Sequence, residues 1–146
     1  MARPRRDKEH LGIDSNVLVA YLVAAHPDHG RVHSLRNRGH AVNPTVIHET
    51  YHACVFKLKV EPWDMTDLLL EYMRGALFLN TTYGIVVLGL KIAREYGIGG
   101  RDSLILASYL MSGRVSKLVT LDRALLGLGK VSHGGRSLKI ISPDSL

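Results

Sequence analysis

Two groups of side chains in this sequence could do chemistry, and both contain Glu49. The first is the hexapeptide IHETYH at residues 47–52, where His48 and His52 are four residues apart. Two imidazoles one helical turn apart, with a glutamate beside them, can bind Zn²⁺ and activate a water, as in zinc proteases. The second group is a set of carboxylates that includes the same glutamate: Asp14, Glu49, Asp102 and Asp122.

The zinc interpretation needs a third protein ligand. The extended protease motif requires glycine and histidine at positions 55 and 58, where this chain has valine and leucine. Glu71 is the remaining candidate, but it lies in an ordinary amphipathic segment, DLLLEYM. A zinc metalloprotease using His48, Glu49 and His52 therefore stays an alternative. Among eight histidines, however, a chance pair around a glutamate is common, so we expect His48 and His52 to be surface histidines without a metal.

Short apolar segments alternate with helical patterns along the chain. Strands are predicted at the start of residues 10–25 and in residues 40–43, 76–80, 115–122 and 138–141. Helices are predicted after the polar turn at residues 14–16, in residues 26–38, 45–58, 63–74, 83–96 and 101–112, and, as a short helix, after residue 122. This alternation predicts an α/β fold, a three-layer α/β/α sandwich with a mostly parallel central sheet.

One predicted helix carries the hexapeptide. Apolar residues recur there at spacings of four, three and four, in the order Ile47, Tyr51, Cys54 and Leu58. That spacing predicts one buried stripe along residues 45–58. The next helix is expected to begin at Pro62, since proline is favoured in a first helical turn, and Trp63 is expected to be a core or interface anchor.

The four carboxylates fall at informative places in this fold. Asp14 and Asp122 directly follow predicted strands, and Asp102 opens a helix after a glycine turn. Parallel sheets bind ligands at the carboxyl ends of their strands, so these acids are expected at one edge. Each acid alone could be a helix cap or a solvated charge. Together they repel one another unless cations bind, and Mg²⁺ or Mn²⁺ prefers such oxygen ligands.

These residues resemble the PIN-domain ribonucleases, most closely the small VapC-type toxins of toxin–antitoxin pairs. The resemblance covers almost the whole chain. It depends on Asp14-Ser15-Asn16 after the first strand, Glu49 in a central helix, Asp102 before SLILA, and Thr120-Leu121-Asp122 after a late strand. It implies an endoribonuclease that uses one or two Mg²⁺ or Mn²⁺ ions, bound by Asp14, Glu49, Asp102 and Asp122, with Ser15, Asn16 and Thr120 in supporting positions.

The same resemblance implies a homodimer and a small antitoxin protein as partners. The sequence also departs from the family pattern, because many relatives have an additional acid and an aromatic residue where this chain has Ala124 and Leu125. Leu125 can still fill a core position. Ala124 removes one carboxylate, which leaves the number of bound ions open.

Composition fits a protein that binds RNA. There are 19 Lys and Arg residues against 13 Asp and Glu, and four of those acids belong to the predicted site, so the remaining surface should be positive. Arg101 and Arg123 are candidates for weak phosphate contacts, and residues 1–9 are expected to form a flexible basic arm on a single domain spanning residues 1–146.

The remaining expectations concern location and alternatives. Cys54 is the only cysteine, which excludes an intrachain disulfide and fits a reducing cytoplasm. No secretory signal or membrane span is expected, because no apolar run is long enough. A PIN-like module that binds RNA or protein without cutting is the second interpretation of the same fold.

Overall fold

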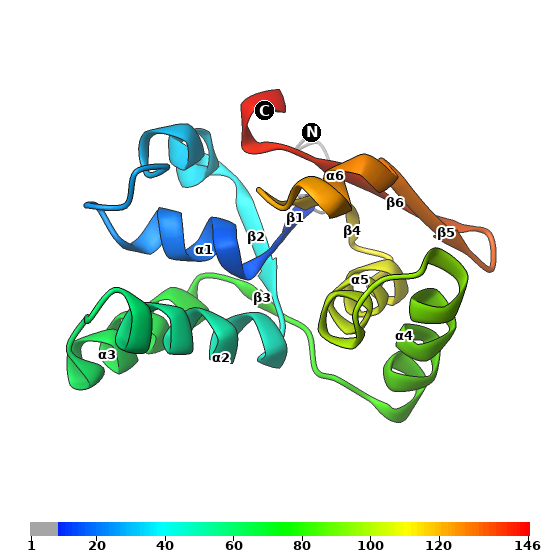
Figure 1. Cartoon of the computed structure of the whole chain (residues 1–146), viewed down its shortest axis with the longest axis horizontal. Coiled ribbons are helices and arrows are strands. Elements are labelled where there is room, and N and C mark those ends of the chain that lie inside the picture. The colour runs from blue at the N-terminus through cyan, green and yellow to red at the C-terminus, as the bar shows by residue number, and fades with distance from the viewer. Residues whose placement is uncertain (1–8) are drawn as a thin grey trace, which may run out of the picture.

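A six-stranded sheet runs through the middle of the protein, in the strand order β3-β2-β1-β4-β6-β5 (Figure 1). A computed structural model describes the protein over residues 9–146, so the flexible basic arm expected at residues 1–9 lies outside the described residues except for Glu9. Its strands are β1 (His10–Ile13), β2 (Gly39–Val42), β3 (Leu77–Phe78), β4 (Val115–Val119), β5 (Lys130–His133) and β6 (Arg136–Ile141). All neighbouring pairs are parallel except β5 with β6, so the predicted mostly parallel sheet is confirmed.

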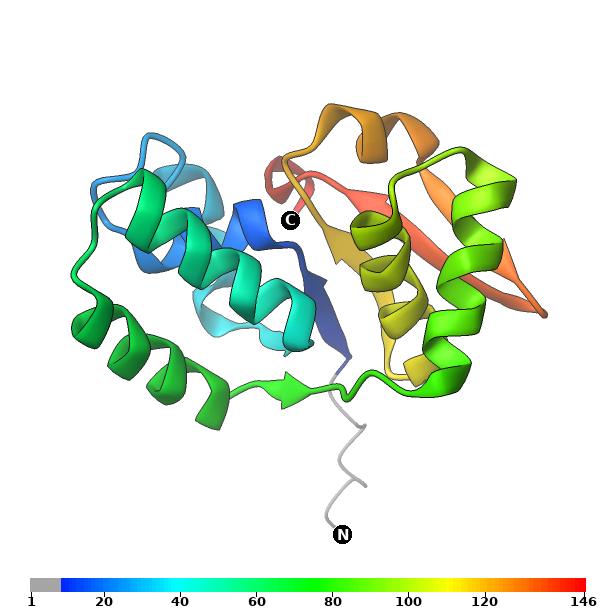
Figure 2. The same ribbon diagram turned by 60° about the horizontal axis from the view of Figure 1, so that its bottom comes forward.

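Helices cover the sheet. They are α1 (Ser15–Leu22), α2 (Pro44–His52), α3 (Pro62–Arg74), α4 (Tyr83–Tyr96), α5 (Gly100–Ser112) and α6 (Arg123–Leu128), with shorter turns η1 (Gly30–Asn37), η2 (Ala53–Lys57) and η3 (Pro143–Ser145). In Figures 1 and 2, α1, α2 and α3 gather on one side of the central strands, and α4 and α5 on the other. This arrangement confirms the predicted α/β/α sandwich. No helix in residues 9–146 is long and apolar enough to cross a membrane.

Three sequence predictions are wrong in detail. Residues 26–38 do not form an α-helix: Pro27 interrupts the segment, and only the 3₁₀ turn η1 forms. The predicted helix over residues 45–58 changes from α to π geometry at Ala53, which leaves Leu58 44% exposed instead of buried. The strand β5 lies in a segment where no strand was predicted. Trp63, expected to be a core or interface anchor, is 80% exposed in this single chain, so it lies outside the core, and its role at an interface stays a prediction.

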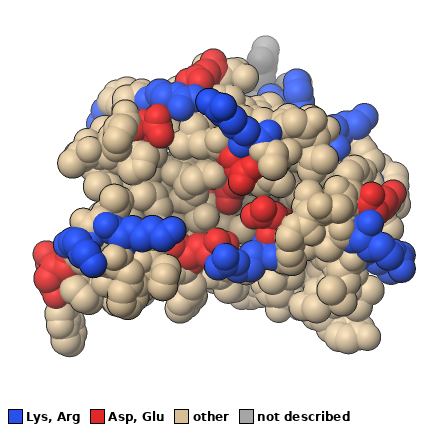
Figure 3. All heavy atoms as spheres, viewed as in Figure 1, with Lys and Arg blue, Asp and Glu red and all other residues tan. Residues whose placement is uncertain are grey.

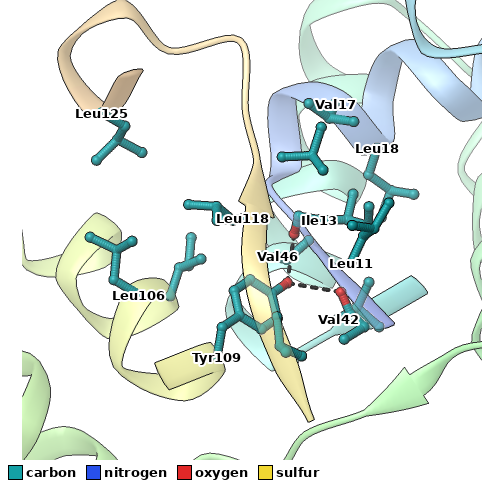
Figure 4. Packing of buried hydrophobic residues seen from close by; sticks show 14 of the residues in the cluster. Leu11, Ile13, Val17, Leu18, Val42, Val46, Leu106, Tyr109, Leu118 and Leu125 are labelled. Atoms are coloured by element: carbon teal, nitrogen blue, oxygen red, sulfur yellow. Dashed lines mark hydrogen bonds between the residues drawn. The ribbon is translucent and has the colours of Figure 1, made fainter. Parts of the chain in front are cut away.

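The centre of the core is organised around Tyr109 of α5 (Figure 4). Its hydroxyl lies 2.6 Å from the carbonyl oxygen of Ile13 and 3.0 Å from that of Ala41, so one side chain links α5 to β1 and β2. The ring packs over Gly12 of β1, where an added Cβ would lie 2.7 Å from the ring atom Cδ2. A glycine in the first strand is therefore required for this helix to approach the sheet.

His40 of β2 is a buried histidine held in its neutral form. Its Nε2 donates to the carbonyl oxygen of Leu35 at 2.7 Å, so its Nδ1 accepts from the hydroxyl of Tyr72 at 2.7 Å. Burial is the main cause that lowers the pKa of His40 below its usual 6.5, and nearby His10 lowers it further. The ring of Tyr21 packs edge-on against it.

Acidification is expected to destabilise the protein through His40. Below about pH 6.5 the unfolded chain gains a proton at this position that the folded chain does not, so the contribution of His40 to stability decreases as pH falls from 7.5 to 5. His40→Gln removes this contribution and should flatten the decrease in melting temperature over that range. The exposed His33→Gln is the matched control and should melt with the native pH dependence; equal slopes for all three proteins would contradict the assignment.

Candidate active site

Asp14 is fixed at the point where β1 ends and α1 begins. Its side chain is only 4% exposed. As the N-cap of α1, it accepts a hydrogen bond on Oδ1 from the backbone N–H of Ser15 at 2.8 Å. Its Oδ2 accepts from the hydroxyl of Thr120 at 2.7 Å. Thr120 directly follows β4, so the carboxyl ends of two neighbouring parallel strands are joined here, as the sequence predicted.

The hydroxyl of Thr120 is the centre of a small network. It also accepts from the backbone N–H of Asp122 at 3.0 Å and lies 3.4 Å from the Asn16 side-chain nitrogen. Asn16 in turn accepts from the backbone N–H of Leu121 at 3.1 Å. Thr120 and Asn16 therefore fix the loop after β4 relative to the start of α1, as the supporting role predicted for them requires. Ser15 donates to Asp14 only through its backbone.

Asp122 is the N-cap of α6. Its Oδ1 accepts from the backbone N–H groups of Ala124 and Leu125, at 2.8 and 3.1 Å. Leu125 is buried, which confirms that it fills a core position despite the departure from the family pattern. Arg123, next to Asp122 in sequence, is exposed, and its weak RNA contact stays a prediction.

Glu49 and Asp102 reach the same region from two helices. Glu49 lies on α2, with Oε2 3.9 Å from Nη1 of Arg101. Its Oε1 is buried and has no hydrogen-bond partner within residues 9–146. Asp102 lies in the first turn of α5, but the N-cap of that helix is Gly99, so Asp102 is not the cap that one interpretation of the sequence allowed. Asp102 places a negative charge in the first turn of α5, where the helix dipole favours it, and Glu49 lies within ion-pair distance of Arg101.

Burial and mutual repulsion raise the pKa values of three of these acids. Burial raises the pKa of Asp14 to about 6, against the hydrogen bonds from Thr120 and Ser15, and the charges of Asp102 and Glu49 raise it further. Burial also raises the pKa of Glu49, with Arg101 opposing it and Asp102 adding to it. The pKa of Asp102 is raised by burial and then by the charge of Asp122. These couplings connect all four predicted acids.

A cleft of about 550 Å³ opens beside the acids, between α1, α2 with η2, and the start of α5. Of the four acids, Glu49 lines it directly, while Asp14 and Asp102 are each next in sequence to a lining residue. The other residues that line it are Ser15, Asn16, Val19, His48, His52, Ala53, Lys57 and Arg101. Figure 3 shows acidic atoms gathered in the hollow at the middle of one face, with basic side chains at its borders.

The donor set fits a hard divalent cation. It consists of carboxylate oxygens, and the buried Oε1 of Glu49 lacks any other partner. Within residues 9–146, however, no three His, Cys, Asp or Glu side chains lie close enough to hold one ion together. A cation here would therefore be bound by one or two carboxylates with water completing its shell, as Mg²⁺ commonly is.

The zinc protease alternative receives no support from the geometry. Glu71, the third ligand that it requires, is exposed on α3 and bonds to Arg74 at 3.2 Å. His48 and His52 are exposed, as predicted. They nevertheless line the same cleft as Glu49, and Lys57 joins them there. Lys57 could not be predicted to line this cleft, since an uninterrupted α-helix would not place it beside the two histidines.

Comparison with known families defines the class of this protein. The family model described as the PIN domain matches residues 12–130, a span that contains all four acids. The chain therefore belongs to the PIN domain family, and this part of the predicted resemblance is confirmed. A search of curated proteins gives no match.

Solved structures with the same fold come from several bacteria. A toxin–antitoxin complex from Klebsiella pneumoniae has a chain with 16% identity and a TM-score of 0.65, covering 91% of this chain and 97% of its own. VapC20 from Mycobacterium tuberculosis, described as a sarcin–ricin loop cleaving toxin, has 12% identity and a TM-score of 0.68, with coverages of 83% and 96%. DNA-bound VapBC from Salmonella typhimurium has 15% identity and a TM-score of 0.63, with coverages of 92% and 98%. At these identities the likeness shows the fold.

Proposed function

We propose that the protein is a metal-dependent endoribonuclease that acts as the toxin of a VapBC-type toxin–antitoxin pair. The observation that carries the proposal is the electrostatic coupling of four carboxylates at the carboxyl ends of β1 and β4, with a buried, unpartnered oxygen on Glu49. Such a group is costly unless cations bind. Membership of the PIN domain family and fold neighbours named as toxins support it.

The chain's own residues set the geometry for phosphodiester hydrolysis. When bound, Mg²⁺ or Mn²⁺ supplies an activated water and offsets charge on the phosphate oxygens. Thr120 holds Asp14 in one orientation, and Asp102 and Glu49 contribute charge from two other elements. Glu49, whose pKa is raised by burial, is positioned to orient a water and accept its proton. Arg101, mostly exposed beside Glu49, is positioned to contact a phosphate.

An antitoxin segment is proposed to bind the apolar groove between α2 and α3. This groove of about 330 Å³ is lined largely by Ile47, Tyr51, Leu69, Leu70 and Met73. His48 lines both this groove and the acidic cleft, so a peptide held in the groove would lie beside the site. Helix-in-groove binding uses such surfaces. A neighbouring short gene for a DNA-binding protein would support this partner.

A homodimer is proposed through α4. Tyr83, Val86 and Leu90 follow one another at helical spacing on this helix and are 85%, 42% and 67% exposed in the single chain. An apolar helix face of this kind marks an interaction surface. With a single cysteine in the sequence, the proposed location is the reducing cytoplasm.

RNA cleavage that depends on Mg²⁺ or Mn²⁺ tests the proposed function. The purified chain should cut a labelled single-stranded RNA in the presence of either ion. Cleavage should stop when EDTA removes the ion, because the carboxylates then have no counter-charge. At saturating RNA, His52→Ala should keep most activity, and Asp102→Asn should lose it. Gel electrophoresis of the RNA fragments measures cleavage by the native chain and by the two variants.

Two other outcomes would contradict the proposal. Activity that requires Zn²⁺ and His52 but survives Asp102→Asn would favour the metalloprotease alternative, tested in parallel on a peptide substrate. RNA binding without cleavage under any ion would favour a non-cleaving binding module.

A further inference from the structure

The wall of the cleft beyond Glu49 carries nitrogen donors that the proposed hydrolysis does not use. His48 and His52, four residues apart, share one face of α2 and line the cleft. Lys57, five residues after His52, lines it too. Lys57 forms no ion pair among the described residues. The cleft is therefore lined by the carboxylate of Glu49, by two imidazoles and by a cation that forms no ion pair among the described residues, while Asp14 and Asp102 lie next in sequence to lining residues.

A change in helix type places Lys57 in this wall. From Ala53 the backbone forms one π turn, closed by the bond from the Leu58 N–H to the Ala53 carbonyl oxygen at 3.1 Å. In a continued α-helix, the residues three and four after His52 would follow it on the same face. Those are Val55 and Phe56. The wider π turn brings the fifth residue, Lys57, to the cleft, and turns of this type frequently occur at functional sites.

The ring of His52 is supported from outside the cleft. It packs on Phe56 with ring centroids 4.9 Å apart and planes tilted by 37°. Phe56 is itself 58% exposed and is not among the residues that line the cleft. Phe56 and Lys57, neighbours in this π turn, therefore point in different directions. The ring of Phe56 lies outside the cleft against His52, and Lys57 lines the cleft.

We propose that Lys57, His52 and His48 form a subsite for a backbone phosphate of the RNA strand, adjoining the phosphate that is cut. The subsite rests on the proposed nuclease function and specifies how the strand is held. A lysine provides a compact charge for a phosphate, and imidazole nitrogens provide hydrogen bonds. The cleft is far larger than one phosphate, so it can hold a strand that reaches from the acids to Lys57.

Binding of RNA by a non-cleaving background tests the subsite. In Asp102→Asn with Mg²⁺, a fluorescent 12-nucleotide single-stranded RNA should bind about five to ten times more weakly after Lys57→Gln, and the slope of log K against log salt should decrease by about 0.7, the value for one lost phosphate contact. Adding His52→Gln should weaken binding further. Lys59→Gln is the matched control: it removes the same charge two residues along, outside the cleft, and should bind as the background does.

Cleavage kinetics separate the subsite from the reaction itself. With Asp102 intact, Lys57→Gln should raise KM about five- to tenfold and leave kcat within about twofold, because its contact is made equally before and during the reaction. Melting temperatures equal to that of the native chain would establish that the exposed substitution leaves folding intact.

Each alternative result has a definite meaning. Equal affinities for Lys57→Gln and Lys59→Gln, from a chain that cuts RNA, would overturn the subsite and leave the nuclease standing. A native chain that neither binds nor cuts RNA would overturn both. A matching loss of affinity for a poly-glutamate peptide would assign this wall to an acidic protein segment instead of RNA.

Discussion

Asp14→Asn is expected to reduce metal-dependent RNA cleavage by on the order of 10³-fold and, at the same time, to stabilise the metal-free protein at pH 7.5. Activity falls because the amide supplies no negative charge to a cation. Stability rises because the native chain must bury a carboxylate whose pKa is raised to about 6, mainly by desolvation. At pH 7.5 that shift destabilises the native chain by about 3 kcal/mol. The variant regains less than this, because its poorer hydrogen bond to Thr120 offsets about 1 kcal/mol.

The sign of this effect can be checked by varying pH. A folded pKa above the unfolded value favours the protonated form, so the contribution of Asp14 to the stability of the metal-free native chain decreases as pH rises from about 4 through about 6. The advantage of Asp14→Asn in melting temperature should therefore be a few degrees at pH 7.5 and should vanish near pH 4. Mg²⁺ should stabilise the native chain and leave the variant unchanged. The exposed Asp67→Asn is the control and should alter neither property.

Retention of cleavage by Asp14→Asn would refute its role in the site. A lower melting temperature at every pH would show that the Thr120 and Ser15 hydrogen bonds outweigh the cost of burying the charge.

Gly12→Ala is expected to have the largest effect on folding. The new methyl group would lie 2.7 Å from the ring of Tyr109, which is fully buried and cannot move away without breaking the contacts of its hydroxyl with Ile13 and Ala41. Overpacking of this kind costs about 2–3 kcal/mol, or roughly 4–10 °C in melting temperature for a chain of this length. Thermal unfolding followed by circular dichroism measures it.

A second glycine provides the contrast. Gly127 lies inside α6 with open space where its Cβ would be. Gly127→Ala should therefore stabilise the protein by about 0.5–1 kcal/mol, since alanine is the better helix former. Destabilisation by both substitutions to a similar extent would mean that the close approach of Tyr109 does not set the cost at Gly12.

The sequence predicted the site better than it predicted the segments between elements. Asp14 and Asp122 could be placed because each comes within three residues after the end of an apolar strand, β1 or β4, and parallel strands end at one edge. Asp102 and Glu49 could each be assigned to a helix. Their proximity could not be predicted, because no local sequence pattern gives the distance between α2 and α5. The structure brings these two acids near Asp14.

The failures have local physical causes. A helix was predicted over residues 26–38 from length and polarity, but Pro27 and Gly30 leave only a 3₁₀ turn. The apolar stripe ending at Leu58 assumed a constant α period, and the π turn at Ala53 shifts every later side chain around the axis. Because of the same shift, the position of Lys57 in the cleft could not be predicted from the sequence. Strand β5 is short and half polar, and it forms through its hairpin with β6.

The helix caps described above bear on how an inactive relative of this protein could be recognised. Asp14 and Asp122 each satisfy backbone N–H groups at the start of a helix. A descendant that had lost catalysis would still gain about 1 kcal/mol of folding stability from keeping Asp122, whereas the cost of burying the charge of Asp14 exceeds the benefit of its cap. Glu49 caps no helix, and one of its oxygens is buried without a partner within residues 9–146. Glu49 is therefore a more informative marker of retained activity than Asp122, and its replacement by a neutral side chain would be an early trace of a nuclease turned into a binding protein.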